Sequence, residues 1–268
     1  MTHKTVDSFI RWAGSKRQIR PILAKYWNSE FNRYIEPFVG SGNLFFFLQP
    51  NKSLLSDINS ELIDTYTQIK NNPESVYKIL VSIPVGESAF YKIRQMSTKE
   101  LSQEEAAARF IYLNIFAFNG LYRTNLKGEF NVPYGRQKNP HIPNLDRYLL
   151  CSELLQTAQI LCCDFETSLD KAQKGDFVYL DPPYKVNGKK IFHEYDKSGF
   201  STDEIRRLKC QLAKLNSRGV RFLLSYAKSE EAEMLVEGFC KTEIIVRRNI
   251  AGFAQHRRND VEWLITNL

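Results

Sequence analysis

Two stretches of alternating strand and helix patterns, separated by a long helical block, constrain the fold of this chain most strongly. Helical patterns occur at residues 17–27, 202–217 and 229–237. Apolar runs of strand length lie at residues 32–38, 53–58, 159–163, 177–180, 220–225, 242–247 and 261–266. Strands separated by helical lengths favour a mostly parallel sheet with helices on both faces. The sequence therefore predicts an α/β fold.

Helical patterns dominate the stretch from residue 59 to residue 150. In residues 103–118, apolar side chains recur with the 3.6-residue spacing of one helix face. Residues 120–143 are rich in Gly, Pro and Asn, which is typical of a loop or a short hairpin. Because this block interrupts the alternation, we predict a discontinuous domain of residues 1–58 and 151–268 with an inserted, mainly helical domain at 59–150.

The composition indicates a globular protein. The chain has 268 residues, of which 43% are hydrophobic and 25% are charged. It has no run of about 18 apolar residues, the length needed to cross a bilayer, and its first seven residues lack the apolar stretch of a secretory signal. We therefore expect a cytoplasmic protein that makes no use of a membrane.

The cysteines and histidines do not have the spacing of a metal site. Five cysteines are scattered without a C-x-x-C pair, and the four histidines are isolated, so no metal ion is expected. Cys162 and Cys163 are adjacent in an apolar run, which predicts a buried strand. We expect all five to be reduced thiols that act as small hydrophobic side chains.

The net charge of +7 favours a polyanionic partner, and one segment concentrates basic residues. Residues 109–140 contain five basic residues and one acid, Glu129. The basic residues are Arg109, Arg123, Lys127, Arg136 and Lys138, and the interleaved aromatic residues are Tyr112, Phe116, Phe118, Tyr122, Phe130 and Tyr134. Positive charge beside rings that stack on bases is typical of a nucleic-acid surface. A solvated basic face beside a hydrophobic core fits the same pattern.

A glycine turn and a later acid predict a nucleoside-containing cofactor. Gly40 and Gly42 follow the first strand, where glycine permits a tight turn and the close approach of a ligand. Asp57 ends the next strand, where a carboxylate can accept hydrogen bonds from ribose hydroxyls. Phe45 occupies the place of the third glycine of the dinucleotide motif, so the turn suits S-adenosylmethionine better than NAD. A structural turn followed by a capping aspartate fits the same residues.

The tetrapeptide Asp181-Pro182-Pro183-Tyr184 follows the apolar run at 177–180, and so lies where α/β sheets bind ligands. Two prolines fix the backbone and leave a rigid turn with an acid, carbonyl oxygens and an aromatic ring. Asp181 and the Pro182 carbonyl can accept the N–H bonds of a base's exocyclic amine, and Tyr184 can stack on its ring. Methyl transfer to such an amine requires orientation and local electrostatics, without a metal or a covalent nucleophile. The alternative is a structural proline turn capped by Asp181.

Four segments of the chain resemble the Dam-type DNA adenine N(6)-methyltransferases of the D12 class (alpha group). They are residues 9–16, with Ser15 in place of a glycine, residues 36–42, residues 119–136 and residues 181–184. The longest, 119–136, is similar to the target-recognition hairpin of members that methylate adenine in GATC. The resemblance implies a Rossmann-like sheet that binds S-adenosylmethionine, an inserted target-recognition domain, and a monomer that acts on double-stranded DNA.

The resemblance also implies roles for individual residues. Catalysis would fall to Asp181, Pro182 and Tyr184. Cofactor contacts would come from Trp12, Lys16, Glu36, Phe38, Gly40, Gly42, Asp57, Asp164 and Asp181. DNA contacts would come from Arg11, Phe118, Asn119, Leu121, Arg123, Asn131, Pro133, Arg136 and Lys138. Arg123 would read a guanine edge, and Leu121 and Pro133 would touch bases. Phe118 and Asn119 would enter the space around a flipped adenine.

Two positions depart from the family pattern near the expected site. Residues 185–190 replace a P-L-S-x-T-like run, and Tyr226 stands where asparagine is frequent. Two other functions stay open at this point: methyl transfer to an amine of cytosine or RNA, and a catalytically silent DNA-binding protein on the same scaffold. A nicotinamide oxidoreductase would need the third glycine, and a cytosine carbon-5 methyltransferase would need a cysteine after a proline.

Overall fold

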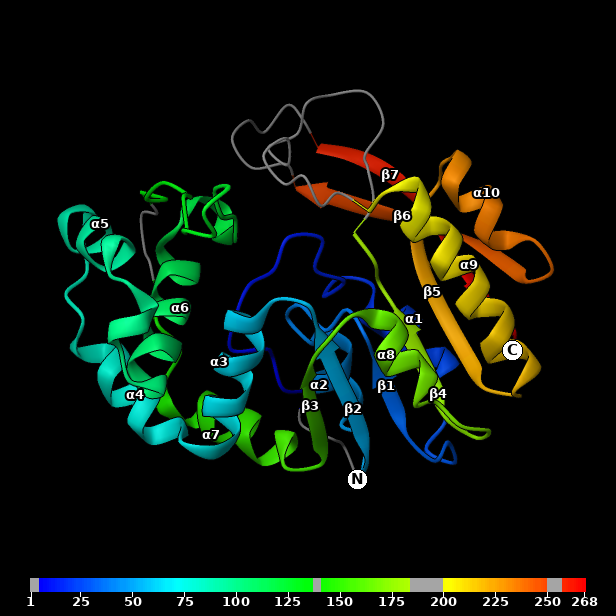
Figure 1. Ribbon diagram of the computed structural model, residues 1–268, viewed down its shortest axis with the longest axis horizontal. Coiled ribbons are helices and arrows are strands. Elements are labelled where there is room, and N and C mark those ends of the chain that lie inside the picture. Colours follow the sequence, from blue (N-terminus) through cyan, green and yellow to red (C-terminus); the bar gives the residue numbers. More distant parts are fainter. Residues whose placement is uncertain (1–4, 137–140, 184–199, 250–256) are drawn as a thin grey trace.

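A mixed sheet forms the centre of the computed structural model, which describes residues 5–136, 141–183, 200–249 and 257–268. Its strands are β1 (Tyr34–Glu36), β2 (Ser53–Asp57), β3 (Ala158–Cys162), β4 (Phe177–Leu180), β5 (Arg221–Ala227), β6 (Cys240–Asn249) and β7 (Arg257–Thr266). Within the described ranges these seven strands have the order β3-β2-β1-β4-β5-β7-β6. Strands β1 to β5 are parallel, and β7 runs antiparallel to β5 and β6. The predicted Rossmann-like, mostly parallel α/β sheet is confirmed (Figure 1).

Helices cover the sheet and extend beyond it. They are α1 (Arg20–Leu23), α2 (Asn43–Leu48), α3 (Ser60–Asn71), α4 (Pro73–Ser82), α5 (Glu87–Gln95), α6 (Gln103–Phe116), α7 (Leu145–Leu155), α8 (Phe165–Asp170), α9 (Thr202–Ser217) and α10 (Glu230–Val236), with 3-10 turns η1 (Ala24–Tyr26), η2 (Thr98–Glu100) and η3 (Phe118–Gly120). The predicted helices at 202–217 and 229–237 are confirmed as α9 and α10. The helix predicted at 103–118 ends at Phe116, because Ala117 has extended backbone angles. Among the described helices, none is long and apolar enough to span a bilayer.

Alternating side chains of the central strands divide between two cores. Tyr34 and Tyr179 pack in the core that contains residues of α2, α3, α6 and α7. Ile35 and Val178, their neighbours in sequence, pack with residues of α8, α9 and α10 on the other face (Figure 1). This period of two is that of strands covered on both faces. Polar groups that could bind a ligand therefore lie at the ends of the strands.

Helices α3 to α7 and the segment 117–135 connect β2 to β3. Helix α6 contacts α3, α4 and α5, and its residues 107–116 are all buried. Ser102 and Glu105 form a capping box that begins this helix. Residues of α6 and residues of the sheet belong to one hydrophobic core. The predicted domain boundary between residues 150 and 151 lies within helix α7. The division into residues 1–58 with 151–268 and residues 59–150 stays a prediction.

The strand predicted at 159–163 is confirmed as β3, but the prediction that Cys162 and Cys163 are buried is wrong. In the described sheet β3 is an edge strand that pairs with β2, so one side of its backbone lacks a neighbouring strand. Cys162 is exposed, and Cys163 is half-buried just beyond the strand. Cys210 and Cys240 are exposed as well, so only Cys151 of the five free thiols is a buried hydrophobic side chain.

The basic and aromatic residues of 109–140 do not form one surface. Arg109 is buried, and so are three of the interleaved aromatic residues, Tyr112, Phe116 and Phe130. Arg109 Nε donates to the Ile93 carbonyl at 3.0 Å, and Nη2 donates to the Arg94 carbonyl at 3.0 Å. Both carbonyls lie in the last turn of α5, where the regular i+4 donors of a helix are missing, although Ile93 O also accepts from Met96 N at 3.3 Å. Arg109 therefore caps α5 from within the core and does not contact phosphate.

Replacing Arg109 with methionine, which keeps most of the side-chain volume, should destabilise the protein by about 1–3 kcal/mol because two partly buried carbonyls at the end of α5 each lose a hydrogen bond. Denaturant titration measures this loss. The matched change Lys127→Met, at an exposed position, should alter the free energy of unfolding by less than about 0.5 kcal/mol. An Arg109→Met protein of unchanged stability and weakened DNA affinity would contradict the capping role.

Candidate active site

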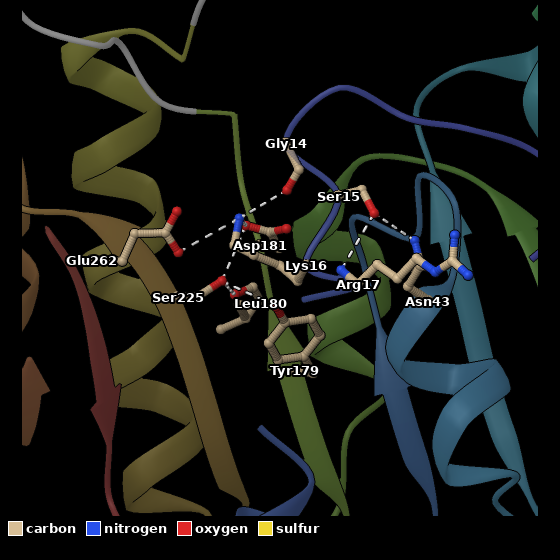
Figure 2. Close-up of polar contacts among 10 residues, drawn as sticks. All are labelled: Gly14, Ser15, Lys16, Arg17, Asn43, Tyr179, Leu180, Asp181, Ser225 and Glu262. Atoms are coloured by element: carbon tan, nitrogen blue, oxygen red, sulfur yellow. Dashed lines mark hydrogen bonds and ion pairs between the residues drawn. The ribbon is translucent and has the colours of Figure 1, made fainter. Parts of the chain in front are cut away.

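The polar residues of the candidate site meet at the carboxyl ends of three adjacent strands. Strands β2, β1 and β4 are neighbours in the sheet; they end at Asp57, Glu36 and Leu180, and Asp181 follows Leu180 directly. The carboxyl ends of parallel strands are the usual ligand-binding edge of an α/β sheet. The N-terminal segment 11–17 reaches the same edge and approaches Asp181 (Figure 2).

Asp181 is held by a lysine and a serine from distant parts of the chain. Lys16 Nζ lies 2.7 Å from Asp181 Oδ1, and Ser225 Oγ donates to the same oxygen at 3.0 Å. Tyr179 OH lies 3.1 Å from Ser225 Oγ and fixes that hydroxyl (Figure 2). Burial raises the pKa of Asp181, while the Lys16 charge and the Ser225 hydroxyl lower it. Both bonds end on Oδ1, so they orient the carboxylate without engaging Oδ2.

Lys16 is a buried cation, with only 5% of its side chain exposed. Its ammonium also donates to the Gly14 carbonyl at 3.1 Å and lies 3.9 Å from Glu262 Oε2 on β7. Because an unpaired charge is costly to bury, the two acids supply the compensating charge. The structure thus brings together Lys16, predicted to contact a cofactor, and Asp181, predicted to be catalytic.

Gly40 and Gly42 form the predicted turn between β1 and α2. Their φ angles of 45° and 59° lie in the left-handed region that favours glycine. Gly40 N donates to Asp57 Oδ2 at 3.1 Å, and Asn59 N donates to Asp57 Oδ1 at 3.1 Å. Burial raises the pKa of Asp57, and these backbone donors lower it. A carboxylate has about four acceptor positions, so Asp57 can still bind a pair of hydroxyls.

Trp12 closes the glycine turn from the side of the helical segment. A Cβ atom at Gly40 would lie 2.7 Å from the Trp12 ring, so only glycine fits this contact. Trp12 also stacks on Tyr122, with ring centroids 5.7 Å apart. Tyr122 OH in turn donates to Glu61 Oε2 at 3.1 Å. Trp12 therefore connects the turn to the helices that follow β2.

Three other residues predicted to contact a cofactor have partners within the protein. Glu36 is buried and accepts a hydrogen bond from Tyr34 OH at 2.9 Å, and burial raises its pKa well above the usual range. Phe38 is half-buried and packs on the first residue of α8. Asp164 caps the start of α8 and pairs with Arg207 Nη2 at 2.6 Å. Asp164 is half-buried too, so it keeps an accessible surface beside this ion pair.

Acids outnumber the cation at the site. Its described part contains the buried side chains of Glu36 and Glu262, the half-buried Asp57 and Asp181, and one lysine, Lys16. Besides burial, the charges of Asp181 and Asp57 raise the pKa of Glu36. A positively charged ligand would relieve this repulsion. No group of three or more His, Cys, Asp or Glu side chains suited to a metal ion occurs in the part of the chain that the structure describes.

The segment predicted to read DNA contains a short hairpin. Asn131 N donates to the Arg123 carbonyl at 3.0 Å, and Thr124 pairs with Phe130 in an antiparallel bridge. Across the hairpin, Arg123 Nε donates to Asn131 Oδ1 at 2.7 Å. Asn131 thus orients the guanidinium of Arg123. These two side chains line a surface hollow together with Asn125, Leu126 and Lys127.

Asn114 joins the N-terminal segment to the base of this hairpin. Its side chain, on α6, accepts from Arg11 N at 2.8 Å and donates to the Arg11 carbonyl at 2.8 Å. It also donates to the Gly120 carbonyl at 3.3 Å. The buried Asn114 side chain binds the backbone of Arg11. The side chain of Arg11 is exposed, as a contact with DNA requires.

The remaining predicted DNA contacts lie on the surface or outside the described residues. Arg136 is exposed and pairs with Glu87 of α5 at 3.1 Å. Lys138 and the predicted catalytic residue Tyr184 lie outside the described residues. Leu121 is half-buried, and the exposed positions near the hairpin base are Phe118, Asn119 and Pro133.

Three residues that surround Asp181 belong to no motif in the sequence: Tyr179, Ser225 and Glu262. Ser225 lies near the end of β5, beside β4, and a polar residue in an otherwise apolar strand is the signal that could have found it. Tyr226, the departure from the family pattern, is buried in the core on the opposite face of the sheet. The residue next to Asp181 is therefore Ser225, and Tyr226 is a core residue.

A model of one protein family matches most of the chain. Its description is "D12 class N6 adenine-specific DNA methyltransferase", and it matches residues 12–250. The chain belongs to this family. It is therefore an adenine-specific DNA methyltransferase, and the acidic site at the end of β4 is the candidate place of methyl transfer.

Similar proteins come from bacteria and an archaeon. The chain is 38% identical to the Type II methyltransferase M1.LlaDCHI of Lactococcus lactis subsp. cremoris, over 97% of this chain and 94% of that protein. It is 35% identical to the Type II methyltransferase M.MjaIII of Methanocaldococcus jannaschii, over 98% and 99% of the two chains. It is 31% identical to the Retron Ec67 DNA adenine methylase of Escherichia coli, over 96% and 90%. The likeness thus extends over nearly the whole methyltransferase.

Replacing Gly40 with alanine should destabilise the methyltransferase more than the matched change Gly14→Ala. Both glycines have positive φ, so each change costs about 1 kcal/mol in backbone strain. Only at Gly40 would the new Cβ atom collide with Trp12, whereas nothing lies within 4 Å of a Cβ at Gly14. Denaturant titration of both variants measures the difference, and equal losses would contradict the packing of Trp12 on the turn.

Proposed function

We propose that this methyltransferase transfers a methyl group from S-adenosylmethionine to the N6 amine of an adenine rotated out of double-stranded DNA, within the sequence GATC. The observation that carries the proposal is the oriented carboxylate of Asp181, at the end of β4 and beside the glycine turn. The chain holds both this acid and the hairpin with Arg123, which supports action as a monomer on DNA.

The residues around the glycine turn fit S-adenosylmethionine. Asp57 has acceptor positions left for ribose hydroxyls, and Gly40 and Gly42 bring the backbone close to a ligand. The excess of acids over cations at the site complements the positive charge of a sulfonium. When bound, S-adenosylmethionine supplies an electrophilic methyl group whose carrier leaves as a neutral thioether.

Asp181 and Pro182 supply the acceptors that an exocyclic amine requires. The lone pair of N6 is delocalised into the purine ring, so the nitrogen is a weak nucleophile until its N–H bonds are polarised. Because Lys16 and Ser225 both bind Oδ1, Oδ2 and the Pro182 carbonyl can accept the two N–H bonds. These bonds draw N6 toward tetrahedral geometry and stabilise the positive charge that develops there. In this proposal Tyr184 stacks on the flipped base.

The hairpin supports recognition of guanine and thymine. Arg123 forms a hydrogen bond to Asn131 through Nε, and a guanidinium is the group that makes bidentate contacts with O6 and N7 of guanine. Leu121 and Pro133 offer apolar contacts of the kind that senses a thymine methyl. The resemblance of residues 119–136 to hairpins of GATC-methylating members supports GATC as the site.

The direct test is to incubate the protein with unmethylated genomic DNA and S-adenosylmethionine and then to map modified bases. We expect N6-methyladenine in GATC. The variant Asp181→Ala should give no modification, because the amine loses its acceptor, while its affinity for duplex DNA stays within about twofold of the unmodified protein. Retained affinity also shows that the variant is folded.

Each alternative function has its own outcome in this experiment. Modified cytosine, or transfer to RNA alone, would favour the broader class of amino-methyltransferases. Sequence-specific binding without modification would favour a catalytically silent DNA-binding protein. Full activity of Asp181→Ala would contradict the proposed mechanism.

Replacing Arg123 with alanine should reduce discrimination at one guanine by about 1–3 kcal/mol, because one bidentate base contact is lost. Asn131→Ala should reduce discrimination at the same guanine, since Arg123 loses the acceptor that orients it. The measurement is kcat/KM on duplexes that differ from GATC at one base pair. Lys127→Ala, at an exposed position of the same hairpin, is the control and should leave the discrimination unchanged. If Arg123→Ala also leaves it unchanged, Arg123 does not read the sequence.

A further inference from the structure

Glu262 is a buried acid at the edge of the candidate site, and it belongs to none of the motifs found in the sequence. It lies on β7, opposite Ala227 of β5 and Ile244 of β6. Its side chain is 2% exposed, and its Oε2 atom lies 3.9 Å from Lys16 Nζ (Figure 2). A carboxylate in such a place loses most of its hydration, and the ammonium of Lys16 compensates part of that loss.

The ammonium of Lys16 lies between several acceptors. An ammonium is a donor only. One N–H reaches Asp181 Oδ1 at 2.7 Å and one reaches the Gly14 carbonyl at 3.1 Å, and Glu262 lies within ion-pair distance of the same nitrogen. Lys16 is therefore attracted to one acid on β7 and to another after β4. Because β5 separates β7 from β4, the pull of Glu262 on the ammonium is directed away from Asp181 and opposes a closer approach to its second oxygen.

We propose that Glu262 is a positioning residue that keeps Lys16 on Oδ1 of Asp181, so that Oδ2 stays available to the amine of the target base. The inference rests on the proposed function, because it takes Asp181 as the acceptor for that amine. Without the charge on Glu262, the ammonium can bridge both oxygens of Asp181. It then competes with the amine for the acceptor.

The charged and titratable groups around Asp181 give the expected sign of a pH effect. They are Lys16 on the N-terminal segment, Tyr179 on β4, Glu262 on β7, and Tyr34 and Glu36 on β1. Burial raises the pKa of Asp181 most, Lys16 lowers it, and Glu262 raises it. Removing the charge of Glu262 therefore lowers the pKa of Asp181, and a closer Lys16 lowers it further.

The test is Glu262→Gln, which keeps the shape of the side chain and removes its charge. In the protein without DNA or cofactor, the carboxyl carbon of Asp181 is followed by ¹³C NMR as the pH is varied. We expect its apparent pKa to fall in Glu262→Gln and to stay close to that of the unmodified protein in Glu262→Asp, which retains the charge. Glu243→Gln is the matched control, since Glu243 on β6 is half exposed and pairs with Lys228 instead.

Kinetics provide the second readout. In Glu262→Gln, kcat for DNA methylation should fall about tenfold or more, because the acceptor for the amine is displaced, and the acid limb of kcat against pH should move to lower pH. The Kd for duplex DNA should not change. If the apparent pKa of Asp181 is the same in Glu262→Gln and in the unmodified protein, the inference is overturned, even if methylation is observed. If the titration shifts as expected and the unmodified protein does not methylate DNA, the proposed function fails and the charge coupling stands.

Discussion

A buried ion pair between Lys16 and Asp181 joins the N-terminal segment to the end of β4, and the arrangement of the site depends on it. Its two residues are 165 positions apart in the chain, and Nζ lies 2.7 Å from Oδ1. Removing one partner of such a pair costs about 3–5 kcal/mol, since the other charge stays buried alone. The same segment places Trp12 on the glycine turn and bonds Arg11 to Asn114. One short segment therefore aligns the acid, the turn and the base of the hairpin.

The electrostatics of the site follow from the fold. Parallel strands bring Glu36, Asp57 and Asp181 to one edge of the sheet, and the antiparallel strand β7 adds Glu262 from the side. Burial raises the pKa of Glu36, Asp57 and Asp181, and the charge of Lys16 lowers the pKa of Asp181 alone among them. A site of this kind favours a cationic methyl donor and an amine that becomes positive as it reacts. DNA adenine methylation combines both.

Much of the fold could be predicted from the sequence, because periodicity is a local property. The strand runs, α9 and α10 follow from patterns within about 16 residues, and Asp181 follows from a turn next to an apolar strand. Burial depends on contacts between distant segments, so the exposure of Cys162 and the capping role of Arg109 could not be predicted. Ser225 and Glu262 were missed for the same reason. They approach Asp181 only because β5 lies beside β4 and β7 beside β5.

In the proposed function Asp181, oriented by Lys16 and Ser225, accepts the amine of an adenine taken out of the duplex. This role is tested most directly by a crystal structure of the protein with a GATC duplex and S-adenosylhomocysteine, which cannot donate a methyl group. We expect an extrahelical adenine whose N6 lies within hydrogen-bond distance of Asp181 Oδ2 and the Pro182 carbonyl. A bound duplex with its adenine still stacked, or with N6 bonded to other groups, would contradict it.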